Sequence, residues 1–131
     1  MLKVKHVMIE DVVTAKPNIT AKDAVKTLRE THVGSIIITD ENRKCIGIFT
    51  ERDAIRIIAS DVSLDTPIEQ VMTKNVATIG KEASLEEARR LIISHGIRHL
   101  PVVDSEGKLV GLFSVRKLID ELYGLTATKY C

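Results

Sequence analysis

The sequence has few of the residues from which several kinds of binding site are built. Aromatic residues make up 3% of the 131-residue chain and tryptophan is absent, which argues against a stacking platform for single-stranded nucleic acid or for a carbohydrate. The two cysteines, Cys45 and Cys131, have no metal-ligating or redox spacing. No apolar run approaches the roughly 18 residues that span a bilayer, and the N-terminus lacks an apolar signal core. We therefore expect a reduced, cytoplasmic setting without a membrane partner.

The chain also lacks an excess of charge of either sign and the common catalytic motifs. It has 19 Lys and Arg residues against 18 Asp and Glu residues, a net charge of +1. No uniform field would draw it to nucleic acid or to an anionic membrane. Glycine-rich phosphate loops and the usual nucleophile and zinc motifs are missing, and no nucleophile is paired with a base. These absences predict a protein that is not an enzyme and that has no metal site and no cofactor.

What the chain does contain is an internal duplication. A shift of 64 residues aligns 7–55 with 71–119 without a gap, and 11 of the 49 aligned positions are identical, against about three by chance. Both halves predict the order β-α-β-β-α, and capping-box patterns at Thr20 and Ser84 open their first helices. Gly34 and Gly96 lie near the expected ends of those helices. The predicted divisions are a first repeat at 1–60, a polar linker at 61–67, a second repeat at 68–125 and a tail at 126–131.

The length of each half predicts how the halves are used. About 65 residues are marginal as an independent fold, so the expected class is α+β, with two βαββα repeats stacked sheet against sheet with pseudo-twofold symmetry. The second helix of each half has more apolar residues than one buried face needs. Two interpretations stay open: a homodimer through these helices, or intramolecular packing that uses all of this surface. The apolar residues are Ala54, Ile55, Ile57, Ile58 and Ala59 in the first half and Leu118, Ile119, Leu122 and Tyr123 in the second.

Three sequence pieces in a fixed order carry a family resemblance. They are the Val-Met-x3-Val-x-Thr opening at 7–14 and again at 71–78, the middle strand at 96–104, and the strand-to-helix turn at 47–53. Together they resemble a pair of CBS domains, the module named after cystathionine β-synthase, over residues 7–120. The resemblance implies two stacked βαββα repeats and a regulatory role in which AMP, ADP, ATP or S-adenosylmethionine is bound, as in energy sensing. It also implies a flat, disc-shaped homodimer.

The strand-to-helix turn holds the first candidate site residues, Thr50 and Asp53. A carboxylate one turn into a helix can accept both hydroxyls of a ribose, and the helix N-terminus donates to phosphate. The resemblance implies that Asp53 holds the ribose and that Thr50 contacts ribose or phosphate. The same pair also fits a plain helix cap worth about 1 kcal/mol. In the second repeat Ser114 keeps the hydroxyl but Lys117 replaces the carboxylate, and lysine accepts no hydrogen bond. The second ribose site is then empty, binds its ligand weakly, or contacts phosphate through Lys117. We therefore expect one principal nucleotide site per chain.

A basic pair in the second repeat is the next candidate. Arg98 and His99 align with Gly34 and Ser35, so only one repeat is basic at this position. Resemblance to the γ subunit of the AMP-activated kinase implies that this pair reaches the phosphates of the nucleotide whose ribose Asp53 holds. A guanidinium makes forked bonds to phosphate. The alternatives are a solvated arginine and a structural histidine.

The remaining candidates depend on the family layout. Arg52 and Arg116 form a repeated pair that either adds phosphate-binding charge or consists of exposed first-turn residues. The layout places Thr14, Ala15 and Ile36 at the adenine end, with a plain core role as the alternative for Ile36. The basic set favours a phosphorylated ligand over S-adenosylmethionine without choosing among AMP, ADP and ATP.

The predicted function is therefore a non-catalytic module that binds an adenine nucleotide in a cleft between the repeats. It would signal in trans to an unidentified protein partner by a shift between arrangements. The alternative is a nucleic-acid-binding or transcription-associated CBS protein. A cleft lined by basic residues would favour it, but the neutral charge and scarce aromatics argue against a nucleic-acid partner. The basic residues in question are Arg52, Arg98, His99, Arg116 and Lys117.

Overall fold

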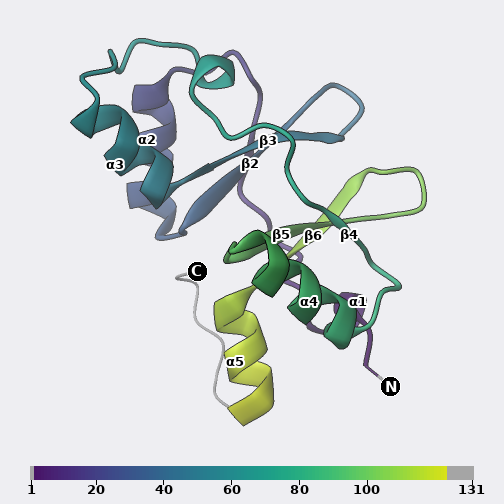
Figure 1. The fold of residues 1–131 in the computed structure, drawn as a ribbon. Coiled ribbons are helices and arrows are strands. Elements are labelled where there is room, and N and C mark those ends of the chain that lie inside the picture. Colours follow the sequence, from purple (N-terminus) through teal and green to yellow (C-terminus); the bar gives the residue numbers. More distant parts are fainter. Residues whose placement is uncertain (1, 124–131) are drawn as a thin grey trace. The chain divides into compact units, whose positions relative to one another are not determined.

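The computed structural model describes residues 2–123, with side chains for 2–120, and has the predicted α+β class. Two three-stranded sheets and five α-helices make up these residues (Figure 1). The elements are α1 (Val4–Val7), β1 (Thr14–Ala15), α2 (Ala21–Thr31), β2 (Ser35–Thr39), β3 (Cys45–Thr50), α3 (Glu51–Ala59), the 3-10 turn η1 (Ile68–Gln70), β4 (Ile79–Gly80), α4 (Leu85–His95), β5 (His99–Val103), β6 (Leu109–Ser114) and α5 (Val115–Tyr123).

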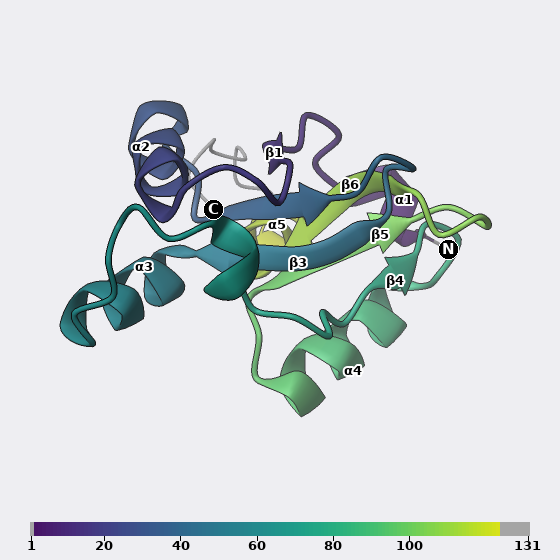
Figure 2. The same cartoon turned by 90° about the horizontal axis from the view of Figure 1, so that it is seen from above.

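The chain divides into two compact units. The first unit is residues 13–76, and the second unit joins residues 2–12 to 77–123. The sheets have the orders β1-β2-β3 and β4-β5-β6, and in each the first pair of strands is parallel and the second antiparallel (Figure 2). The predicted β-α-β-β-α order is therefore confirmed in both halves.

The opening segment of each sequence repeat belongs to the other repeat's unit. Ile9 pairs with Leu112 of β6, and Thr73 pairs with Ile48 of β3. The predicted linker at 61–67 is also part of the first unit, since the carbonyl oxygens of Leu64 and Thr66 accept from the first amides of α2. The compact units are thus offset by about a dozen residues from the repeats read in the sequence.

The core of the first unit explains how α3 is placed. α2 and α3 lie next to each other (Figure 1) and pack their apolar faces on β2 and β3. Phe49 of β3 and Ile57 of α3 are both fully buried in this cluster. Burial of one such side chain contributes about 1.5–3 kcal/mol, so the start of α3 is held against a rigid strand end.

The predicted helix starts are confirmed, and of the two glycines near the helix ends only Gly96 is the capping residue. The Thr20 side chain accepts from the Asp23 amide in a full capping box, and Ser84 accepts from the Glu87 amide. Gly96 ends α4 in the left-handed region with φ 61°. Gly34 does not end α2, because the left-handed residue there is His32, with φ 56°. The 64-residue shift places His32, and not Gly34, opposite Gly96.

A methionine lies against a strand glycine in each unit. A Cβ atom at Gly47 would fall inside the contact distance of the Met72 sulfur, and one at Gly111 would do the same with Met8. At Gly111 a backbone atom, the Ile9 carbonyl oxygen, would also lie only 3.1 Å away. The opening segments therefore approach β3 and β6 at distances that only glycine permits.

A charged clamp ties the N-terminal segment to the second unit. Lys3 Nζ and Lys5 Nζ each lie 2.9 Å from a carboxylate oxygen of Glu82. The Val4 amide donates to the Ala83 carbonyl at 2.8 Å beside them. The two ammonium groups lower the pKa of Glu82 from 4.5 to about 2.

Glu82→Gln is expected to make the melting temperature depend less steeply on pH in the acid range. Because the folded pKa lies below the unfolded one, the clamp stabilises fully above pH 4.5, and its contribution is lost as pH falls toward 2. Thermal melting of both proteins between pH 6 and pH 2 measures this. The wild-type curve should fall more steeply than that of the variant, whereas parallel curves would contradict the clamp.

The apolar second helices divide into buried and exposed residues. In α3, Ala54 and Ile57 are buried, while Ile55 and Ile58 are 69% and 58% exposed. In α5, Ile119 is 42% exposed, and the side chains of Leu122 and Tyr123 lie outside the described residues. Intramolecular packing therefore does not use all of this surface.

Candidate functional site

The first candidate site is the start of α3, where β3 ends at Thr50. Asp53 is only 7% exposed. The Thr50 hydroxyl oxygen accepts from the Asp53 amide at 3.2 Å, and Asp53 Oδ2 accepts from the Thr50 amide at 2.9 Å. The Thr50 hydroxyl also donates to Oδ2 at 3.1 Å. The cap interpretation is thus correct, and it leaves a fixed carboxylate in the first turn of a helix.

The other oxygen of this carboxylate is held by two side chains from further along the chain. Asp53 Oδ1 accepts from Arg56 Nη2 at 3.3 Å and from the Thr73 hydroxyl at 3.1 Å. Arg56 Nη2 also donates to the Val71 carbonyl oxygen at 2.7 Å. Asp53 therefore accepts from four donor groups within the first unit.

A buried hydroxyl lies beside this cluster. Ser35 begins β2 directly opposite Thr50, and it is 3% exposed. Its Oγ has no hydrogen-bond partner within the described part of the chain. Buried polar atoms of this kind are rare, and each calls for an explanation such as an unplaced water or ligand.

The matching place in the second unit is basic instead of acidic. Ser114 Oγ accepts from the Lys117 amide at 3.1 Å, so this serine caps α5 as Thr50 caps α3. His99 pairs with Ser114 across the strands, and the Arg98 carbonyl oxygen accepts from the Val115 amide at 2.9 Å. The two helix starts thus carry a carboxylate in the first unit and a lysine with an adjacent Arg-His pair in the second.

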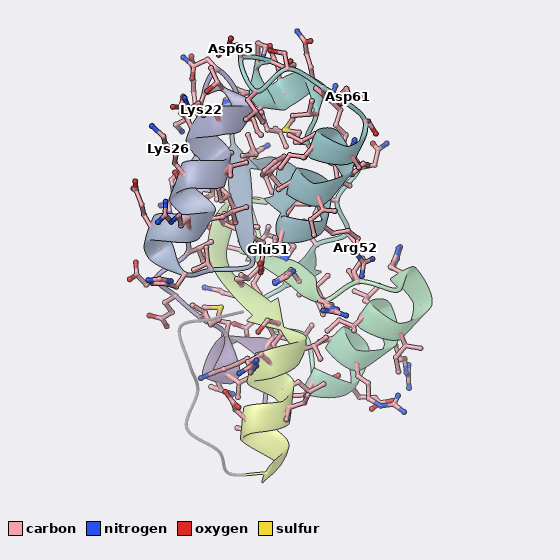
Figure 3. All side chains as sticks on the ribbon, turned by 90° about the vertical axis from the view of Figure 1, so that its left-hand side faces the viewer. Lys22, Lys26, Glu51, Arg52, Asp61 and Asp65 are labelled. Carbon is pink, nitrogen blue, oxygen red and sulfur yellow. The ribbon has the colours of Figure 1, made fainter. Side chains whose placement is uncertain are left out.

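The other predicted site residues fall into four settings. Arg52 lies exposed on the first turn of α3 next to Glu51 (Figure 3). Thr14 and Ala15 form β1 beside β2, and Thr14 is exposed. Ile36 is fully buried in the core cluster of the first unit. Arg98 and Arg116 are exposed in the second unit, where His99 is half-buried.

The site also contains residues that the sequence analysis missed. Arg56 and Thr73 contact Asp53, and Ser35 lies opposite Thr50, but none of the three was singled out as a site residue. One signal was available, because the 64-residue shift places Arg56 opposite Asp120 and Thr73 opposite Ile9. The positions that correspond to Arg56 and Thr73 therefore carry different residues in the second unit, as does the position that corresponds to Asp53, which is Lys117.

The described residues contain neither a membrane-spanning helix nor a cluster of metal ligands. Within residues 2–123, no helix combines the length and apolar character that crossing a bilayer requires. The same stretch holds no group of three or more His, Cys, Asp or Glu side chains that could bind a metal ion.

Comparison with known sequences identifies both repeats. The family model "CBS domain" matches residues 4–60 and 68–124. An uncharacterized 17.7 kDa protein of Acidianus ambivalens is 36% identical over 116 residues, 88% of this chain and 70% of that protein. Inosine-5'-monophosphate dehydrogenase of Bifidobacterium longum is 36% identical over 93% of this chain, but the match spans only 22% of that enzyme.

Solved structures give the same result. The CBS domain pair of protein MJ0100, in complex with 5'-methylthioadenosine and S-adenosylmethionine, has a TM-score of 0.85 at 28% identity, over 95% of this chain and 97% of that one. The cytosolic domain of the Mg²⁺ channel MgtE, in complex with ATP, has a TM-score of 0.78 at 25% identity, over 91% of this chain and 48% of that one. The chain belongs to the CBS-domain family, with two CBS domains in tandem.

Proposed function

We propose that this chain is a non-catalytic regulatory module that binds an adenosine-bearing ligand, with Asp53 accepting the ribose hydroxyls. The observation that carries the proposal is the buried carboxylate at the start of α3, fixed through both of its oxygens. Two of its donors are the hydroxyls of Thr50 and Thr73, which can rotate away when a ligand hydroxyl arrives. The Ser35 hydroxyl has no hydrogen-bond partner among the described residues and belongs to the residue opposite Thr50 in the sheet, which supports a polar ligand near this helix start.

The similar structures support the adenosine part of the proposal. The MJ0100 pair is in complex with 5'-methylthioadenosine and S-adenosylmethionine, and the MgtE domain with ATP. Adenosine is the chemistry that these ligands share, whereas only ATP has phosphates. S-adenosylmethionine is therefore as good a candidate ligand as ATP, although the basic residues of the sequence favour a phosphorylated ligand.

The roles of the basic residues remain predictions within this proposal. Arg98 and His99 would bind phosphates of the same ligand, and Arg52 and Arg116 would add positive charge. The exposure of the three arginines and the basic start of α5 are consistent with an anion partner. Ile36 is left out of the proposed contacts, since its side chain is enclosed in the core.

The regulatory part of the proposal concerns assembly. The exposed Ile55 and Ile58 of α3 fit a homodimer through the second helices. A bound ligand would change the output only to the extent that it prefers one arrangement over another. Signalling in trans to a protein partner remains a prediction.

A thermal-shift panel tests the proposal. The ligands are ATP, AMP, S-adenosylmethionine and 5'-methylthioadenosine, with GTP and a short DNA duplex as controls. A ligand at 100 times its dissociation constant stabilises by about 2.7 kcal/mol, which is roughly 8–13 °C for a chain of this size. A shift with adenosine ligands and none with GTP is expected. A shift with DNA alone would favour the nucleic-acid alternative, and no shift with any compound would overturn the proposal.

A further inference from the structure

We propose that Arg56 is a positioning residue that fixes the Asp53 carboxylate for the ligand's ribose hydroxyls. This inference rests on the proposed function. It assigns a role to a side chain that, from its place on an exposed helix face, would count as an ordinary surface arginine.

The anchoring of Arg56 is the first argument. Its Nη2 donates to the Val71 carbonyl oxygen at 2.7 Å and to Asp53 Oδ1 at 3.3 Å. Val71 is 8% exposed, and its own amide donates to the Ile68 carbonyl at 3.0 Å. The guanidinium is therefore tied to a buried backbone oxygen, although 52% of its side chain is exposed. An exposed ion pair alone is worth little, but a guanidinium fixed to backbone can orient its acceptor.

The saturation of the carboxylate is the second argument. A carboxylate offers about four acceptor positions, and in Asp53 the amide and hydroxyl of Thr50, the Thr73 hydroxyl and the Arg56 guanidinium fill them. Two ribose hydroxyls can be accepted only if two donors withdraw. The hydroxyls can rotate, whereas the Thr50 amide is fixed by the backbone and Arg56 by Val71. Arg56 is thus the donor that continues to hold Oδ1 when the ligand is bound.

The second unit provides the third argument, because it differs from the first unit at each of these positions. Under the 64-residue shift Asp53 becomes Lys117, Arg56 becomes Asp120 and Thr73 becomes Ile9.

The features that the fold needs are kept in that unit. Ser114 still caps its helix, and Ile9 still pairs with Leu112 as Thr73 pairs with Ile48. Asp120 is buried, and its Oδ2 has no hydrogen-bond partner among the described residues. The Arg56 contacts therefore accompany the carboxylate and are not required by the fold.

Discrimination between two nucleotides tests this role. The probes are ATP and 2',3'-dideoxy-ATP, which lacks both ribose hydroxyls, and the readout is the dissociation constant from calorimetry. Wild type should bind ATP at least about tenfold more tightly than the dideoxy analogue, in line with charge-assisted hydrogen bonds. Arg56→Met should weaken ATP binding about tenfold and bring the two affinities within about twofold of each other. Arg56→Lys keeps the charge but lacks the fork, so it should recover only part of the preference for ATP.

The controls separate the possible failures. Arg29→Met, which removes an exposed arginine of α2, should leave both affinities unchanged. Equal weakening of both nucleotides by Arg56→Met would overturn the positioning role, because it would indicate attraction of phosphate by charge. If that variant does not fold, Arg56→Lys decides by the same ratio, and a wild-type preference in it overturns the role. Failure of wild type to bind ATP would overturn the ATP form of the proposed function, and this inference with it.

Discussion

Asp53→Ala is expected to lower the affinity for the adenosine ligand by on the order of 100-fold, since two hydrogen bonds to a charged acceptor are lost. The fold should survive, because the Thr50 hydroxyl still accepts from the backbone amide at position 53. The loss of the reverse capping bond costs about 1 kcal/mol, and the loss of the hydrogen bonds from Arg56 and Thr73 to Oδ1 adds to this cost. Calorimetric titration with the ligand identified in the panel, together with thermal melting, measures both effects.

Asp23→Ala is the matched control for this substitution. Asp23 forms the same capping box with Thr20 at the start of α2, but no candidate site residue lies there. A smaller loss of stability is expected, because Asp23 is exposed and makes only the capping bonds, and the ligand affinity should be unchanged. Near wild-type affinity in Asp53→Ala would sink the ribose role, and equal loss of affinity in both variants would indicate an indirect effect of capping.

Gly111→Val should cause the largest loss of stability among the substitutions considered. The added side chain meets Met8 and the Ile9 carbonyl oxygen, and overpacking of this kind typically costs about 1–3 kcal/mol. A fall in melting temperature of roughly 3–15 °C follows for a chain of this size. Differential scanning calorimetry measures it.

Valine substitutions at two other glycines provide the comparison for Gly111→Val. At Gly47 the nearest atoms belong only to the flexible Met72 side chain, and at Gly80 nothing lies within 4 Å. The loss of stability on substitution by valine should therefore rank Gly111 first, Gly47 second and Gly80 last. An equal loss at all three would show that close approach of the opening segments is not the cause.

Most of the fold could be predicted because it is encoded locally and twice. Apolar β-branched runs gave the two long strands of each sheet, and the Thr20 and Thr50 patterns gave the helix starts. The short elements α1 and η1 could not be found, since three or four residues carry no periodicity. Gly34 marked the end of α2 only approximately, because His32, and not a glycine, adopts the left-handed conformation there.

The site was only partly predictable because its remaining contacts are far apart in sequence. Thr50 and Asp53 form a local motif, and their hydrogen bonds span three residues. The bond from Thr73 to Asp53 spans 20 residues, and the bond from Arg56 to Val71 spans 15. Both contacts depend on the opening segment of the second repeat, which pairs with β3 of the first unit. A division of the sequence into consecutive repeats does not reveal this pairing.

The most direct test of the central claim, that the first repeat's helix start holds the ligand, is an NMR titration of the ¹⁵N-labelled chain. The account predicts the largest amide shifts at Ser35 and at Thr50–Asp53 when the adenosine ligand is added. Shifts concentrated at Ser114–Lys117, with the Thr50–Asp53 amides unmoved, would contradict it.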